Sequence, residues 1–189
     1  NFEGFHREPL LGWEEDYVFL QPQLELMLRK GLAQYRHVEV RLAWEATSYE
    51  SLLEEASFVV ACDGGGSSIR SALGVPMMDL GYDEPWLVVD VLVQREVTPP
   101  LPTIIQQVCD PGRLATFVPG HGTHRRWEFQ IHPDEHPDPW ALLSPWGVTR
   151  HHGELIRSVP YRFHALVVER WRDGRVFLLG DAAHQTPPF

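Results

Sequence analysis

The chain has 189 residues and a mass of 21.7 kDa, and 43% of its residues are hydrophobic, so it is long enough to bury a sizeable core. Its 16 basic against 26 acidic side chains give a formal net charge of −10, which argues against a surface for nucleic acid or for an anionic membrane. We see no apolar stretch of transmembrane length and no signal-peptide pattern, and two cysteines make no disulfide framework, so we expect a cytoplasmic protein.

The N-terminal part of the chain predicts a helix and then a strand. A short apolar run ends at Gln21-Pro22, and residues 23–35 then place leucines at helical spacing, at positions 24, 28 and 32. Residues 38–42 alternate between apolar and polar side chains, which is typical of a strand.

A glycine-rich turn follows the next apolar run. Residues 58–62 predict a short buried strand, and Asp63-Gly64-Gly65-Gly66-Ser67-Ser68-Ile69-Arg70 comes directly after it. Glycines let a ligand approach the backbone closely, and Arg70 lies within reach of a phosphate or of Asp63. A simple tight turn is the alternative explanation for the glycines.

The middle of the chain predicts an antiparallel sheet. Its expected strands are residues 86–93, 103–109, 114–118, 125–131 and 161–169, with Pro and Gly between them. We also expect a short helix at residues 140–146, ending at Gly147, and a short helix or turn at residues 154–158. On one of these strands Arg125 or Arg126 could hold a substrate carboxylate, and an ion pair with Glu128 or a neighbour explains them equally well.

Ten histidines raise the question of a metal site. They fall mostly in expected loops beside Pro and Gly, and none forms a helical His-x-x-x-His frame with a third ligand at sensible spacing. We therefore expect solvated loop histidines and no metal.

A second strand-and-turn pattern closes the chain. Residues 176–179 predict a buried strand, and Gly180-Asp181-Ala182-Ala183-His184 follows it, with Pro187-Pro188 just beyond. An Asp before two alanines predicts a helix N-cap at Asp181. Ligands of open α/β sheets bind at the carboxyl ends of the strands, where a carboxylate can accept hydrogen bonds from ribose or ribityl hydroxyls. A capping Asp in a plain strand–turn–helix is the alternative.

The two turn motifs, in this order, resemble those of the FAD-dependent aromatic hydroxylases, the para-hydroxybenzoate hydroxylase-like flavoprotein monooxygenases. Asp63-Gly64 with Ser67 and Arg70 is similar to the family's Asp-Gly-x-x-Ser-x-x-Arg motif, and Gly180-Asp181 with the two prolines is similar to its Gly-Asp motif. The sequence between them resembles one branch, the 3-(3-hydroxyphenyl)propionate hydroxylases. The segments that carry this closer resemblance are residues 83–90, 109–111, 124–128 and 161–165.

The resemblance implies an α/β fold with α+β character, in which part of a Rossmann-like FAD-binding domain is joined to an antiparallel-sheet substrate domain. The implied limits are residues 1–75 for the part with the Asp-Gly motif, 76–170 for the substrate sheet and 171–189 for the return to the FAD domain. The implied cofactor is FAD, with NAD(P)H as co-substrate and a small phenolic acid and O₂ as reactants. No nucleic-acid or membrane partner is implied, and homo-oligomer formation stays open.

The resemblance also implies roles for single residues. The implied cofactor-binding residues are Gln21, Asp63, Gly64, Arg70, Gly180, Asp181 and Pro188. Gln21 would lie against the flavin ribityl chain, although a polar start of a helix explains it as well. Asp181 would bind the ribityl hydroxyls, and Asp63 and Arg70 would serve the FAD and nicotinamide side. Arg125 and Arg126 are the candidates for the substrate, and no side chain can be assigned as the catalytic base.

We expect the chain to be an internal part of a longer enzyme, because it has neither an initiator Met nor the Gly-x-Gly-x-x-Gly fingerprint and ends at Phe189. Residues 43–55 are too few for the hairpin that this fold places between its strands. We therefore expect residues to be absent between about Trp44 and Leu53, and between about Pro133 and Trp140. Two other interpretations stay open: a related hydroxylase of a polyketide or antibiotic phenol, and a non-catalytic ligand-binding remnant of the FAD fold.

Overall fold

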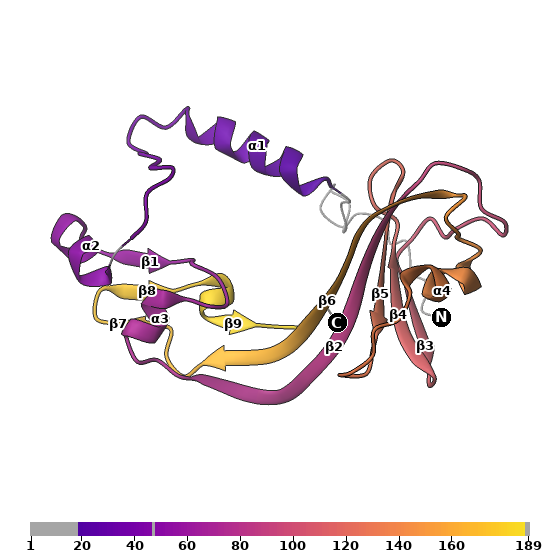
Figure 1. The fold of residues 1–189 in the computed structure, drawn as a ribbon. Helices are drawn as coiled ribbons and strands as arrows, with labels where there is room; N and C mark the ends of the chain where they lie inside the picture. Colours follow the sequence, from indigo (N-terminus) through magenta and orange to yellow (C-terminus); the bar gives the residue numbers. More distant parts are fainter. Residues whose placement is uncertain (1–18, 47, 188–189) are drawn as a thin grey trace, which may run out of the picture. The chain divides into compact units, whose positions relative to one another are not determined.

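A computed structural model describes residues 19–46 and 48–187 (Figure 1). The chain divides into two compact units, which we call the sheet unit (residues 19–39 and 85–161) and the motif unit (residues 40–84 and 162–187). Two long strands, β2 (Met77–Val93) and β6 (Gly153–Val168), contribute to both units. Each unit is described by itself below.

The sheet unit is built on antiparallel strands. β3 (Gln106–Asp110), β4 (Arg113–Val118) and β5 (His124–Gln130) pair in turn, and β5 pairs with β2 in a register that sets Asp90 opposite Arg126. The full strand order is β3-β4-β5-β2-β6-β9, with β9 (His184–Gln185) contributed by the motif unit. The expected strands at residues 114–118 and 125–131 are confirmed within one residue at each end, and the one expected at residues 86–93 is the last part of the longer strand β2.

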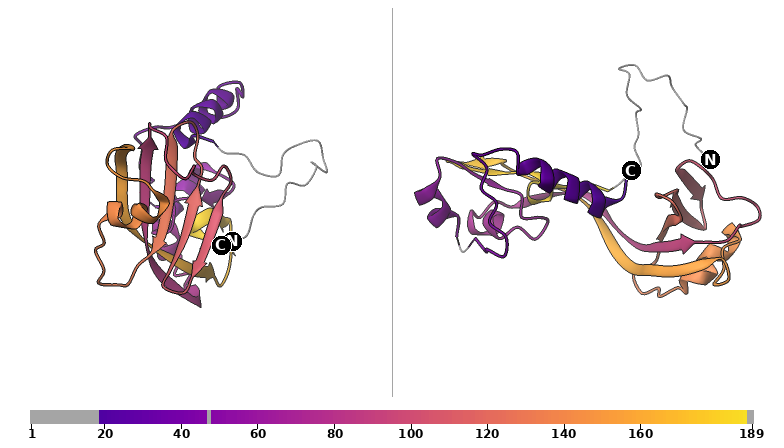
Figure 2. Two further views of the ribbon diagram at one scale, coloured as in Figure 1. Left: turned by 90° about the vertical axis from the view of Figure 1, so that its right-hand side faces the viewer. Right: turned by 90° about the horizontal axis from the view of Figure 1, so that it is seen from above.

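One face of this sheet carries the core of the unit. Val89, Val91 and Trp127 are fully buried there, and side chains of α4 (Pro139–Leu143) and of the 3₁₀ helix η1 (Ser144–Trp146) pack against them. Figure 2 shows the ribbon of this helical segment, in orange, beside the sheet. The ring of Trp127 lies 6.1 Å from that of Trp146, centroid to centroid. Side chains alternate across a strand, so the intervening residues of β2 and β5 present their side chains on the opposite face.

The motif unit contains a three-stranded sheet in the order β1-β8-β7. β1 (Val59–Ala61) and β8 (Val176–Leu178) are parallel, and β7 (Arg172–Asp173) pairs antiparallel with β8. Two short helices belong to the unit, α2 (Tyr49–Glu55) and α3 (Ser68–Ala72), each with a serine side chain capping its N-terminus. The core of the unit comprises Ala61, Val75, Val168, Leu178 and Ala183.

The helix expected near residues 23–35 is confirmed as α1 (Gln21–Leu32), which has a proline in its first turn. None of its residues is buried among the described residues, and Leu28 in the predicted leucine stripe is 62% exposed. No helix in the described ranges is both long enough and apolar enough to cross a membrane.

Three local expectations are wrong. Residues 38–42 form no strand in the described chain, because alternation alone gives extended backbone no hydrogen-bonded neighbour. Residues 154–158 lie inside β6, which runs beside β2, and form neither helix nor turn. Asp181 is no helix N-cap: it lies within a 3₁₀ turn, η2 (Gly180–Ala182), and β9 follows because His184 and Gln185 pair with β6.

Candidate functional site

The two turn motifs meet at one edge of the motif unit. Since β1 and β8 are parallel neighbours, with Ala61 opposite Leu178, their carboxyl ends lie side by side. The N–H of Leu179 donates to the carbonyl of Ala61 at 2.9 Å, which extends the pairing up to the motifs themselves. The Asp-Gly turn and the Gly-Asp turn, far apart in sequence, therefore leave the sheet next to each other.

Asp63 is held at this edge as a carboxylate. The N–H of Ile69 donates to its Oδ2 at 3.2 Å, and the hydroxyl of Ser68 donates to the same oxygen at 3.4 Å. Burial by itself raises the pKa of Asp63, but hydrogen bonds from the side chain of Ser67 and the backbone of Ile69 outweigh it, so the pKa of this carboxyl lies below its ordinary value. Asp63 is therefore ionised at neutral pH and shapes the turn that it begins.

Arg70 connects the two motifs. Its Nη1 donates to the carbonyl of Ala182 at 3.0 Å, and its Nη2 donates to the carbonyl of Gly65 at 2.8 Å. The phosphate and Asp63 were the partners considered from the sequence; the guanidinium instead bridges the backbones of both turns. Arg70 thereby fixes the position of one turn relative to the other.

Gln185 also takes part, and the sequence reasoning missed it. Its side-chain Nε2 donates to the carbonyl of Gly65 at 3.2 Å. The available signal was its place directly after the Gly-Asp motif, but Gln185 was expected beyond a helix start and not on a strand. Only the pairing of Gln185 with Leu166 of β6 brings it next to the glycines.

The Gly-Asp turn is anchored by its two alanines. Ala182 and Ala183 are fully buried, the N–H of Ala183 donates to Gly180 at 2.8 Å, and the N–H of Val168 donates to Ala183 at 2.8 Å. Asp181 is exposed, and within the described part of the chain its carboxylate makes no hydrogen bond or ion pair. The turn therefore presents Asp181 outward on a fixed backbone. Pro188, expected nearby, lies outside the described residues.

The edge fits a hydroxyl-rich cofactor such as the FAD that the motifs imply. Gly64 (φ +82°) and Gly180 (φ +57°) use backbone conformations that favour glycine, and a Cβ at either position would meet nothing within 4 Å. The backbone at both turns is thus open to a ligand, with the carboxylates of Asp63 and Asp181 beside it as acceptors for hydroxyl groups. Gln21 belongs to the sheet unit, at the first turn of α1, where its Nε2 donates to Glu25 at 3.2 Å.

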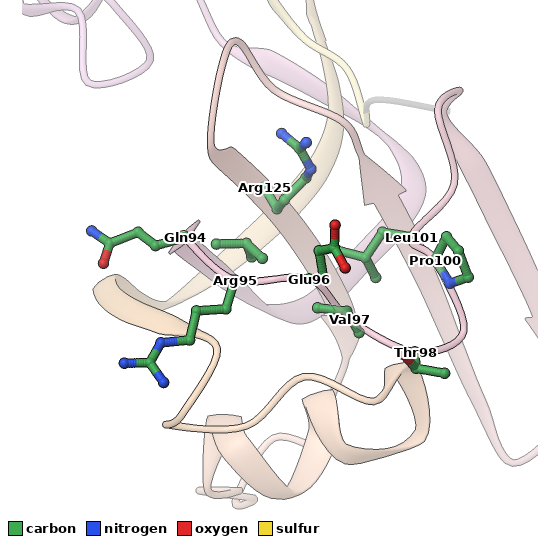
Figure 3. Close-up of a pocket in the computed structure, with 9 residues that line it drawn as sticks. Gln94, Arg95, Glu96, Val97, Thr98, Pro100, Leu101 and Arg125 are labelled. Atoms are coloured by element: carbon green, nitrogen blue, oxygen red, sulfur yellow. The ribbon is translucent and has the colours of Figure 1, made fainter.

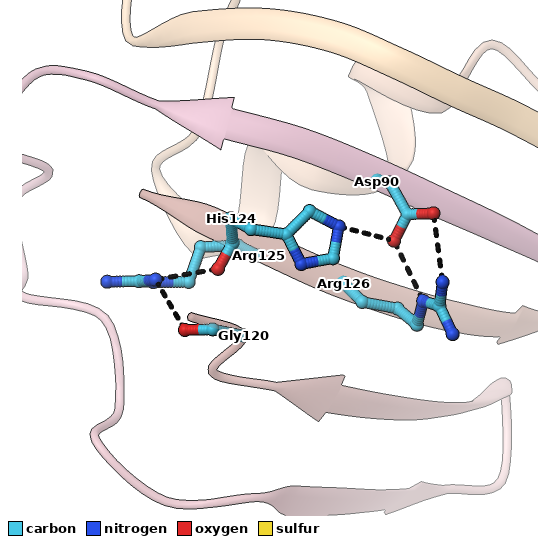
Figure 4. Close-up of polar contacts among 5 residues, drawn as sticks. All are labelled: Asp90, Gly120, His124, Arg125 and Arg126. Carbon is cyan, nitrogen blue, oxygen red and sulfur yellow. Dashed lines mark hydrogen bonds and ion pairs between the residues drawn. The ribbon is translucent and has the colours of Figure 1, made fainter. Parts of the chain in front are cut away.

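A charged cluster lies on the non-core face of the sheet unit (Figure 4). Asp90, only 3% exposed, accepts hydrogen bonds from Nε and Nη2 of Arg126 at 2.8 and 3.1 Å, and Nε2 of His124 lies 3.1 Å from Asp90 Oδ1. The hydrogen bond with Asp90 raises the pKa of Arg126. Burial raises the pKa of Glu128, and the charge of Arg126 offsets this only in part. Arg126 is thus an ion-pair residue, with Asp90 as its partner.

Arg125 points away from this cluster (Figure 4). Its Nη1 donates to the carbonyls of Gly122 and His124 at 2.7 and 2.6 Å. The side chain borders a cavity of about 570 Å³, whose other residues come from the end of β2 and the loop after it, as Figure 3 shows. The cavity is lined by Val93, Gln94, Arg95, Glu96, Val97, Thr98, Pro100, Leu101 and Arg125. Of the two arginines, Arg125 is the one beside open space.

Across residues 19–46 and 48–187, no group of three or more His, Cys, Asp or Glu side chains is arranged to hold a metal ion.

Most of the chain is similar to known proteins. A family model described as an FAD binding domain matches residues 32–189. The chain is 35% identical over 202 residues to a probable NADH-specific resorcinol 4-hydroxylase of Rhodococcus jostii (strain RHA1), with 94% of this chain and 38% of the relative covered. It is 33% identical over 201 residues to a 3-(3-hydroxy-phenyl)propionate/3-hydroxycinnamic acid hydroxylase of Burkholderia cenocepacia (strain HI2424), with 94% and 36% covered. The chain therefore spans little more than a third of the length of these relatives.

Two solved structures share the fold. One is aklavinone-11 hydroxylase in a ternary complex with FAD and aklavinone, at 27% identity and a TM-score of 0.55, with 69% of this chain and 26% of that chain covered. The other is p-nitrophenol 4-monooxygenase PnpA from Pseudomonas putida DLL-E4, at 25% identity and a TM-score of 0.58, with 69% and 35% covered.

Proposed function

The chain belongs to the FAD-binding domain family, and from this premise we propose that the complete protein is a flavin-dependent hydroxylase that inserts one atom of O₂ into a small phenolic acid, using NAD(P)H. One structural observation supports the proposal most directly. The Asp-Gly and Gly-Asp motifs, which the resemblance associates with FAD, lie at the carboxyl ends of two adjacent parallel strands.

The residues at this edge have separate roles in the proposal. Asp181 accepts hydrogen bonds from the ribityl hydroxyls, since its carboxylate is exposed on an anchored turn. Asp63 holds the glycine turn and serves the same cofactor, with Gly64 and Gly180 leaving room for it. Bound FAD would supply the redox chemistry with NAD(P)H and O₂, and the protein would supply binding and orientation. Gln21 and Pro188 remain proposed cofactor contacts.

We propose that Arg125 binds the carboxylate of the phenolic acid substrate. Arg126 already uses Nε and Nη2 on the buried carboxylate of Asp90, whereas Arg125 borders a cavity. A guanidinium with remaining N–H groups can bind a carboxylate bidentately. The sheet that carries Arg125, residues 76–170, is the proposed substrate domain, and residues 1–75 and 171–189 are assigned to the FAD domain.

The test is NAD(P)H oxidation by the complete protein with 3-(3-hydroxyphenyl)propionate and with a neutral phenol. We expect both phenols to stimulate oxidation and to give hydroxylated products, and Arg125→Met to raise KM for the acid about tenfold or more while changing KM for the neutral phenol little. Equal effects on the two phenols would remove Arg125 from carboxylate binding. NADH oxidation that no phenol stimulates would contradict the proposed reaction.

One observation favours a second substrate class. The fold likeness includes aklavinone-11 hydroxylase bound to aklavinone, at 27% identity. Stimulation by a polycyclic phenol of that kind, with no response to the phenolic acid, would select the polyketide or antibiotic phenol. FAD binding without any phenol-dependent turnover would select a non-catalytic ligand-binding protein.

A further inference from the structure

The carbonyl of Gly65 is held by two side chains from different elements. Nη2 of Arg70, on α3, donates to it at 2.8 Å, and Nε2 of Gln185, on β9, donates to it at 3.2 Å. Both contacts are partly buried and both lie within the motif unit. We call these two side chains and the carbonyl the Gly65 clamp.

The clamp determines the direction of a neighbouring N–H. In a trans peptide the carbonyl and the next N–H point to opposite sides, so holding the carbonyl of Gly65 toward Arg70 and Gln185 turns the N–H of Gly66 away from them. Gly66 is exposed, and its N–H has no hydrogen-bond partner among the residues that the structure describes. A donor on a fixed peptide is thus presented at the edge where Asp63 and Asp181 also lie.

A side chain at position 65 would conflict with the clamp. A Cβ at Gly65 would lie 2.8 Å from Nε2 of Gln185, closer than real Cβ contacts come, so the end of this flexible side chain would have to shift. Gly65 is not one of the residues with positive φ, so the conflict is one of space and not of backbone conformation. Any side chain at position 65 would have to displace the amide of Gln185.

We propose that Gln185 is a positioning residue for cofactor binding: with Arg70 it fixes the Gly65–Gly66 peptide so that the N–H of Gly66 faces the bound cofactor. This rests on the proposed function, in which FAD binds at this edge. The chemistry requires a neutral donor, because an ionised carboxylate in the same place would face the carbonyl of Gly65 without a proton to donate.

The first experiment compares Gln185→Leu and Gln185→Glu in the complete protein, by the Kd for FAD and the absorption spectrum of the bound flavin. We expect Gln185→Leu to raise the Kd about tenfold at every pH. Gln185→Glu should match it near pH 8, and near pH 5 it should regain part of the lost affinity relative to the wild type at the same pH, since a fraction of the carboxyl is then protonated and can donate again. Asp63 stays ionised over this range, since its pKa is lowered. Gln34→Leu, on an exposed turn, is the matched control and should bind FAD like the wild type.

The second experiment is a double-mutant cycle with Gly65→Ala and Gln185→Ala. Each change alone should weaken FAD binding, and Gly65→Ala should add little once Gln185 is removed, because the atoms that it would displace are gone. Additive effects, a Gln185→Leu variant with the wild-type Kd, or a Gln185→Glu variant without pH dependence would each overturn the inference. A wild-type protein that binds no FAD would instead refute the proposed function.

Discussion

Asp63 and Asp181 follow neighbouring strands but are held in different ways. Asp63 accepts hydrogen bonds from Ser68 and Ile69, which tie it to its own turn. Asp181 stands exposed on a turn whose fixed points are the buried Ala182 and Ala183. This contrast indicates that Asp63 acts mainly by building the turn, and that Asp181 is the carboxylate available to a ligand.

Replacing Asp181 should therefore affect the cofactor more than the fold. Asp181→Ala is expected to weaken FAD binding about tenfold or more, the loss of a hydrogen bond to a charged group, and to leave the Tm of the FAD-free protein nearly unchanged. Fluorescence titration with FAD and thermal unfolding measure the two effects. Wild-type FAD affinity in this variant would exclude the role given to Asp181.

Glu128 gives a prediction on pH. Burial raises its pKa above the ordinary value, so the folded state favours the protonated form. The contribution of Glu128 to the free energy of unfolding is therefore fully present below the pKa of this group in the unfolded chain. That contribution is lost as the pH rises through the higher pKa of the folded state. Glu128→Gln should raise Tm by roughly 1–4 °C near pH 7 and give no gain near pH 4, as thermal unfolding at both values would show. A gain of the same size at both pH values would be inconsistent with this burial effect.

At the scale of elements, the sequence predicted a strand correctly wherever the local pattern also had a neighbouring strand to pair with. β2 was predictable from its long β-branched apolar run, and β5 because buried residues such as Trp127 alternate with polar ones. Residues 38–42 show the same alternation without a neighbouring strand in the described chain. The role of Gln185 could not be predicted from the sequence. Its strand, β9, forms by pairing with β6, and no local pattern around Gln185 indicates that pairing.

The candidate site divides in the same way. The two motifs and their glycines could be predicted as a ligand-binding site, since their residue types and spacing already indicate that chemistry. The partners of Arg70 and Arg126 could not, because the fold decides them: the register of β2 against β5 sets Arg126 opposite Asp90, and Arg70 donates to the carbonyl of Ala182, far along the chain. Side chains that contact residues distant in sequence need the fold before they can be assigned.

Gly147 offers a prediction at this scale. It ends η1 with φ at +72°, and a Cβ there would lie 2.9 Å from the carbonyl oxygen of Thr98. Gly147→Ala should therefore lower the free energy of unfolding by about 1–3 kcal/mol. Gly31→Ala, in α1 with open space around it, is the matched control and should be neutral or slightly stabilising. Equal Tm shifts in the two variants would contradict the account of Gly147.

At the scale of the whole molecule, the chain is of mixed α/β class and matches the fold of FAD-dependent aromatic hydroxylases, as the sequence resemblance implied. It spans only part of the length of its relatives. That residues are absent near positions 44–53 and 133–140 stays a prediction. Thr47, in the first of these windows, lies outside the described residues. The functional account depends on one arrangement, the meeting of two motifs at a single sheet edge.

The most direct test of that arrangement is the flavin content of the complete protein, purified without added cofactor and measured by its visible absorption spectrum and by the FAD released on denaturation. The account predicts about one non-covalently bound FAD per chain. It also predicts that changing Asp181, and separately Arg70, which joins the two turns, lowers this content. A complete, folded protein that neither retains FAD nor binds it on titration would contradict the central claim.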